Sequence, residues 1–153
     1  MRTLRVLFIA FLVCGIAVSC FAKVNKRSAT ISEIKGKVEM KTSAGSWEEA
    51  KVGAVLTQGD VIITKADSWA TLQLSGAEEA TVNVKPNSQL ALAELTTNEK
   101  KGVQNTLLDL AMGEILIKTQ KLHAKESKFE VKTPTSIVGV RGTVFSVTVE
   151  SVK

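Results

Sequence analysis

The residues best suited to bind a charged ligand lie in one glycine-flanked segment near the C-terminus, Gly139-Val140-Arg141-Gly142-Thr143. A Gly-x-x-Gly turn that carries an arginine could cradle a phosphate or clamp an RNA backbone. We favour a structural role, in which the glycines permit close strand packing and Arg141 pairs with a carboxylate or with carbonyls. No helix is predicted after the segment, and we expect no nucleic-acid partner.

The other residues whose side chains could catalyse a reaction or bind a ligand also favour structural interpretations. The Gly59-Asp60 step between apolar runs is typical of a turn whose Asp accepts local backbone hydrogen bonds. His123 is the only histidine and stands among lysines, where we expect it to be solvated. The serines Ser68, Ser88 and Ser136 have no recognisable base partner in the sequence. We therefore predict no catalytic residue and no enzyme activity.

The N-terminus has the pattern of a targeting signal. Arg2 and Arg5 supply its positive charge, and Val6 to Val18 is a run of 13 apolar or small residues. That run is shorter than the ~20 residues that a membrane-spanning helix needs. Small residues then allow cleavage after Ala22, so we predict residues 1–22 to be a signal peptide, with export to the periplasm or cell envelope.

Lipidation is the alternative form of processing. Ala17-Val18-Ser19-Cys20 is a loose lipobox that lacks the usual Leu. Acylation of Cys20 would hold the protein on a membrane, whereas cleavage after Ala22 would release it, so membrane contact is expected only in the lipidated form. Cleavage after Ala22 would also remove both cysteines, Cys14 and Cys20. With one His and no Cys left, we predict no metal site and no cofactor.

Length and composition indicate a single compact domain of modest charge. The chain has 153 residues, with two Trp, five Phe and no Tyr, so aliphatic side chains must fill its core. Removing Arg2 and Arg5 leaves 18 basic and 15 acidic residues, a net charge of about +3. This small excess gives little reason to expect a polyanionic partner.

Short alternating segments separated by turn residues predict an all-β fold. Strands of this kind recur every 8 to 12 residues from Ile31 onward, with Gly or Pro-Asn-Ser between them. They could stack into a roll or solenoid or pack as a sandwich, and we see no strict internal repeat. We expect a domain over 31–149 preceded by a polar spacer over 23–30.

Two stretches depart from this regular strand pattern. Glu94 to Asn105 is polar and charged, and we expect a long exposed loop. Thr106 to Lys118 could form an amphipathic helix, but Gly113 in mid-run and the isoleucines after it favour two strand halves that meet at Gly113 and Glu114.

An ordered set of motifs resembles the FecR domain family, and the stretch from Thr133 to Phe145 resembles its C-terminal signature most closely. The matching positions are Ile34-x-Gly36-x-Val38; Trp47, Ala50, Gly53, Leu56, Gly59, Asp60 and Ile62; Ala70-x-Leu72-x-Leu74; Pro86-Asn87-Ser88-x-Leu90; Leu110, Gly113, Phe129 and Val131; Thr133-Pro134; Gly139-Val140-Arg141-Gly142-Thr143; and Phe145. The resemblance spans roughly Ile31 to Val149.

This resemblance implies an exported all-β module without known catalytic activity. In iron-transport regulators such a domain lies in the periplasm and relays the state of an outer-membrane transporter to a sigma factor. Direct anti-sigma activity is not expected here, because the cytoplasmic segment and membrane span of those regulators have no counterpart in the sequence. The motif residues are expected to be structural.

The two tryptophans could contact a partner. We place Trp47, at a position of the family pattern, in or partly in the core, and take Trp69, just after a turn, as the better candidate for an exposed contact. We predict a non-enzymatic module that binds another envelope protein for sensing or scaffolding. The alternative is binding of peptidoglycan or another polysaccharide, with an exposed aromatic such as Trp69 beside a polar groove.

Overall fold

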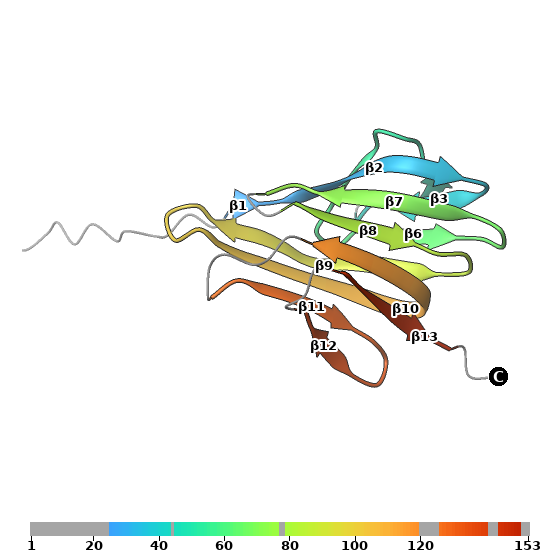
Figure 1. The fold of residues 1–153 in the computed structure, drawn as a ribbon. Helices are drawn as coiled ribbons and strands as arrows, with labels where there is room; N and C mark the ends of the chain where they lie inside the picture. The colour runs from blue at the N-terminus through green and yellow to red at the C-terminus, as the bar shows by residue number, and fades with distance from the viewer. Residues whose placement is uncertain (1–24, 44, 77–78, 120–125, 141–143, 151–153) are drawn as a thin grey trace, which may run out of the picture.

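The computed structural model describes residues 25–43, 45–76, 79–119, 126–140 and 144–150, and this part of the chain is built from β-strands without a helix. The thirteen strands are β1 (Asn25–Lys26), β2 (Ser28–Lys35), β3 (Val38–Lys41), β4 (Trp47–Glu49), β5 (Val55–Thr57), β6 (Val61–Thr64), β7 (Trp69–Leu74), β8 (Ala80–Val84), β9 (Gln89–Asn98), β10 (Val103–Thr119), β11 (Lys128–Lys132), β12 (Ile137–Gly139) and β13 (Val144–Val149). The all-β prediction is confirmed (Figure 1).

One long strand joins the two arms of a curled sheet. The residues of β10 before Gly113 pair with β9, and those after Glu114 pair with β8. Gly113 has a φ of 89°, a conformation that suits glycine, and the strand bends there. The predicted division of this stretch into two strand halves at Gly113 is therefore confirmed, and the helical alternative is wrong.

The two arms repeat the same order of layers. The strand path runs β4-β3-β6-β9-β10 along one arm and β10-β8-β7-β2-β5 along the other. Because β3 follows β2, β7 follows β6 and β9 follows β8 in the chain, each connected pair forms one bent layer across both arms. Successive bent layers give the roll-like stack that the sequence allowed (Figure 1).

Two matching turns form the corner of this roll. Lys65-Ala66-Asp67-Ser68 connects β6 to β7, and Lys85-Pro86-Asn87-Ser88 connects β8 to β9. Asp67 and Asn87, at the third position of each turn, share a φ of 55°. Asp and Asn tolerate this left-handed conformation better than most residues do. The sequence therefore contains a short repeat, Lys-x-Asp/Asn-Ser, that we did not expect.

The serine of each turn anchors the neighbouring layer. Ser68 Oγ accepts a hydrogen bond from the amide of Lys37 at 2.9 Å, and Ser88 Oγ accepts one from the amide of Glu114 at 2.9 Å. A Cβ at Gly36 would collide with Ser68 Oγ, and a Cβ at Gly113 would collide with Ser88 Oγ. Each serine thus needs a glycine opposite it, so each turn is fixed against the bend of the neighbouring layer.

The core lies between the two arms and is almost entirely aliphatic. Its largest fully buried side chains are Ile31, Val38, Leu56, Ile62, Leu72, Leu90, Leu92, Leu95, Leu108, Leu110, Ile115 and Ile117. Alternation along β8, β9 and β10 turns every second residue inward, except where the phase shifts between Leu92 and Leu95 of β9 and at the bend of β10. Burial of this surface is the main force that holds the arms together.

Two segments that looked polar in sequence are structured, which corrects the expected spacer and the expected loop. β1 and β2 begin within 23–30, and β9 and β10 occupy most of Glu94 to Asn105 as a hairpin. Few positions of this hairpin are apolar, but Leu92 and Leu95 are buried in the core. Their burial stabilises the paired strands even though the surrounding sequence is polar. Of its polar residues, Gln104 is also buried, whereas Glu99, Lys100 and Lys101 at the tip are exposed.

Arg27 explains why the polar N-terminal strand joins the fold. Its side chain is buried between the arms, with Nε donating to the carbonyl of Ser75 at 2.5 Å and Nη1 donating to Thr106 Oγ1 at 3.0 Å. Its own amide donates to the carbonyl of Leu95 at 2.9 Å. A buried guanidinium whose donors find acceptors on both arms links them at the edge away from the corner.

Candidate functional site

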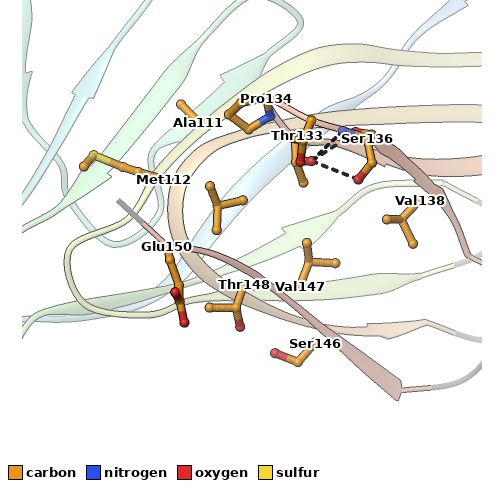
Figure 2. A pocket seen from close by; sticks show the side chains of 12 residues that line it. Ala111, Met112, Thr133, Pro134, Ser136, Val138, Ser146, Val147, Thr148 and Glu150 are labelled. Atoms are coloured by element: carbon orange, nitrogen blue, oxygen red, sulfur yellow. Dashed lines mark hydrogen bonds between the residues drawn. The ribbon is translucent and has the colours of Figure 1, made fainter. Parts of the chain in front are cut away.

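A groove of about 660 Å³ lies at the C-terminal end of the stack, beyond β10. It is lined by Ala111 and Met112 at the β10 bend, by the turn 133–136 with Val138, and by Ser146 to Glu150 along and just after β13. Figure 2 shows the turn and β13 on opposite sides of this groove. The groove therefore separates the hairpin of β11 and β12 from the last strand of the other arm.

The turn that forms one wall is fixed by its own side chains. The Thr133 amide donates to the carbonyl of Ser136 at 2.8 Å, and the Ser136 amide donates to Thr133 Oγ1 at 3.1 Å. Pro134 stands between them, and its restricted φ suits the second position of a tight turn. Thr133 is buried, so the polar bonds of this turn are held in place.

The opposite wall, β13, is set by alternation of its side chains. Phe145 and Val147 lie opposite Ile117 and Ile115 of β10 and pack toward the core. Ser146 and Thr148 point to the outer face and are exposed, and both are among the residues that line the groove. Ser146 Oγ donates to a carboxylate oxygen of Glu114 on β10 at 3.1 Å.

The lining of the groove is mainly uncharged. It consists of apolar side chains and hydroxyl groups, and Glu150 is the ionisable residue among those that line it. Nothing in this lining pairs a nucleophile with a general base, as covalent catalysis requires. Among the residues that the structure describes, His, Cys, Asp and Glu form no group of three or more that could hold a metal ion.

Asp60, which we interpreted as a turn residue, is buried and fully engaged. One carboxylate oxygen accepts the Ser43 amide at 2.8 Å, and the other accepts the Thr57 amide at 2.6 Å and Thr57 Oγ1 at 3.1 Å. The preceding Gly59 has a φ of 96°. These bonds tie the start of β6 to two neighbouring segments, which is a structural role.

The other motif residues lie at the corner, along the groove, at the end of β12 or outside the described residues. Pro86 and Asn87 form the corner turn before β9, far along the chain from Thr133 and Pro134, which line the groove. Gly139 is exposed at the end of β12, and a Cβ there would meet open space, so close packing does not require this glycine. Arg141, Gly142 and Thr143, like Cys20 and His123, lie outside the described residues.

The expected placement of the tryptophans is corrected. Trp47 is 44% exposed, because it begins the edge strand β4, where all three residues are exposed and no further layer covers them. The Lys41 ammonium lies 6.0 Å from the centre of its ring. Trp69, the preferred exposed contact, is partly buried in β7 instead. Neither tryptophan lines the groove.

One surface carboxyl has a perturbed pKa. Glu39 lies 2.8 Å from the Lys65 ammonium and 3.5 Å from that of Lys37, at the corner of the stack. The hydrogen bond from Lys65 is the main cause that lowers the pKa of Glu39, with weaker contributions from the charges of both lysines. This cluster joins β3, the residue just before it and the turn that begins at Lys65, and it supports the layer order rather than a reaction.

Sequence reasoning did not single out the groove residues Met112, Val138, Thr148 and Glu150. Each is ordinary in sequence, and the groove arises only because β11 and β13 flank β10 on different arms. The signal that could have found it is Val144 to Val149, an alternating strand without a charge that follows a Thr-Pro turn.

The comparison with protein families assigns this chain to a family. The model of the family described as FecR protein matches residues 60–153, more than half of the chain. The chain belongs to the FecR protein family. The matched region contains the corner turns, β10 and the groove, while β1 to β5 precede it.

Membership of the FecR family supports a sensing or regulatory domain associated with the cell envelope, in a family not known for enzymes. Searches of curated proteins and of solved structures gave no match. Within the described residues, no helix is long and apolar enough to cross a membrane.

Proposed function

We propose that this FecR-family chain is a non-enzymatic interaction module of the bacterial cell envelope, which binds another envelope protein through the groove between the turn 133–136 and β13. The observation that carries the proposal is the groove itself, a space of about 660 Å³ in which the turn 133–136 and the uncharged strand β13 face each other. Met112 and Val138, on its rim, are 41% and 38% exposed. Apolar side chains accessible beside hydroxyl groups are typical of surfaces that bind proteins.

Site-specific photocrosslinking in cells tests this function. A photoreactive amino acid replaces Val138 or Thr148 in the groove, and Gln73, an exposed residue of β7, serves as the matched control. We expect one envelope protein to be captured from both groove positions and not from position 73. That protein, once purified, should bind wild-type protein more tightly than Thr148→Lys. Equal capture from all three positions, or none, would contradict the proposal.

Polysaccharide binding is the second candidate, because Trp47 is exposed with a lysine beside its ring. An aromatic face of this kind can stack on a sugar. Under this alternative, purified cell wall should retain the wild-type protein and release Trp47→Ala, while Thr148→Lys stays bound. Retention that is unaffected by Trp47→Ala would reject it.

We also propose export with cleavage after Ala22, with lipidation of Cys20 as the alternative. The apolar run before these residues supports either form of processing. The intact mass of the protein isolated from cell fractions distinguishes them, because an acylated Cys20 adds fatty chains and cleavage after Ala22 removes both cysteines. A full-length mass in the cytosolic fraction would contradict both.

A further inference from the structure

The last strand of the roll has an edge that no described strand covers. β13 pairs with β10 through residues Val144 to Val149, and no other described strand pairs with it. Its six residues carry neither a charge nor a proline. Edge strands usually carry such features to prevent pairing with other chains, and β4 at the far end of the stack contains Glu48 and Glu49. The β13 edge lacks this protection.

The groove follows this uncharged edge and has a second wall. Ser146 to Val149 of β13 form one side, while Thr133 to Ser136 and Val138 form the other. A strand of six residues is about 20 Å long. Because the hairpin of β11 and β12 stands across the groove from β13, we expect a single extended strand to reach this edge more readily than the sheet edge of a second folded copy. This geometry favours a peptide segment over a second copy of the chain.

Side chains in the groove indicate the chemistry of such a segment. Met112, Val138 and Val147 provide apolar contacts at different points of the lining. Glu150 supplies the negative charge just past the end of β13, and Glu114 lies opposite Thr148 on the outer face. A strand that alternates apolar residues with others and carries a Lys or Arg beside Glu150 complements these groups.

We propose that the groove binds an extended segment of a partner protein by strand addition, in which the backbone of the segment pairs with the free edge of β13 and a basic residue lies beside Glu150. This inference rests on the proposed function and specifies how its partner is recognised. Backbone pairing provides the affinity, while the apolar contacts and Glu150 select the sequence.

A displayed library of random peptides, each of about nine residues, tests the inference. The library is selected for binding to the processed protein purified from cells. Thr148→Lys is used for counter-selection, because this exposed position lines the groove and the new ammonium would repel a basic segment. Gln73→Lys, on the exposed face of β7, is the matched control. We expect selected peptides to alternate apolar residues and to carry Lys or Arg, with binding lost in Thr148→Lys and kept in Gln73→Lys.

Two measurements on the selected peptides distinguish strand addition from binding by side chains alone. N-methylation of alternate peptide amides along one edge should weaken binding at least about tenfold, because each methyl removes a backbone hydrogen bond. Hydrogen exchange followed by NMR should show slower exchange of amides within 144–149 when the peptide binds. Equal binding by the N-methylated peptide, or unchanged exchange in β13, would overturn the inference.

The remaining outcomes separate this inference from the proposed function. A library that yields no peptide dependent on Thr148 would overturn strand addition, while capture of an envelope protein from position 148 in cells would leave the interaction function standing. A dimer in sedimentation that Thr148→Lys dissociates would assign the edge to a second copy of the chain and overturn the peptide proposal.

Discussion

At the scale of single residues, the buried polar groups of this fold act as links between segments. Arg27 connects both arms, and Asp60 connects the start of β6 to the segments around Ser43 and Thr57. Each charged group has several hydrogen-bond partners, which offsets the cost of removing it from water. None of these groups lines the groove. These two buried charged residues are thus separate from the residues proposed to bind a partner.

Arg27→Met should destabilise the protein by about 2–3 kcal/mol, because the change keeps the aliphatic stem and removes charged hydrogen bonds to Ser75 and Thr106. Urea unfolding measures the change in midpoint. Lys26→Met, at the exposed neighbouring position, is the control and should have little effect. Equal midpoints for the two variants would show that Arg27 does not link the arms.

The lowered pKa of Glu39 gives a prediction with a defined sign. A depressed carboxyl pKa means that the folded state favours the carboxylate, so its stabilising effect exists above the unfolded pKa and is lost as pH falls through the folded pKa. Lys65→Met should raise the pKa of Glu39 toward its ordinary value, as measured by NMR titration. Lys41→Met, on the same strand, is the control. An unchanged pKa in Lys65→Met would refute the assigned cause.

At the scale of elements, the bend of β10 determines the positions of both groove walls. Residues before Gly113 pair with β11, and residues from Gly113 onward pair with β13. The hairpin and β13 therefore diverge from the same strand on different arms. Ser88 holds this bend through the Glu114 amide and leaves no room for a side chain at position 113.

Gly113→Ala should cost at least about 2 kcal/mol more than Gly53→Ala. Both glycines have similar positive φ values, 89° and 86°, so both variants incur similar backbone strain. An added Cβ at position 113 would collide with Ser88, whereas one at position 53 would meet nothing within 4 Å. Thermal or urea unfolding of both variants measures the difference. Equal losses would mean that the bend yields easily and that Ser88 does not fix it.

Much of the element structure follows from local pattern, and the misses have a common cause. Period-two alternation identified the strands and the division of β10 at Gly113. It failed at Arg27, whose side chain bonds to Thr106 far along the chain, and in the hairpin around Asn98, where Thr96 and Thr97 also pair with the distant strand β1. The exposure of Trp47 was missed for the same reason, since only the strand order places β4 at an edge. A local pattern carries no information on which strand becomes an edge.

At the scale of the whole molecule, the protein is a stack of bent layers whose stability should vary along its length. Central layers have a neighbour on each side in both arms, whereas β4 and β5 end the stack at one side. At the other side, β13 is held by β10 alone among the described strands. In stacked folds each layer is stabilised by its immediate neighbours, so end layers open more readily than central ones.

Native-state hydrogen exchange should therefore show the slowest amides in β7, β8 and the second half of β10, and faster exchange in β13. Leu72, Val82 and Ile117 are fully buried and lie on adjacent strands of one arm, so their amides should exchange only by global unfolding. Outward-facing amides of β13 should exchange through smaller local openings. Protection of β13 equal to that of β8 without any added peptide would mean that its edge is already paired, and the groove would then be closed to a partner.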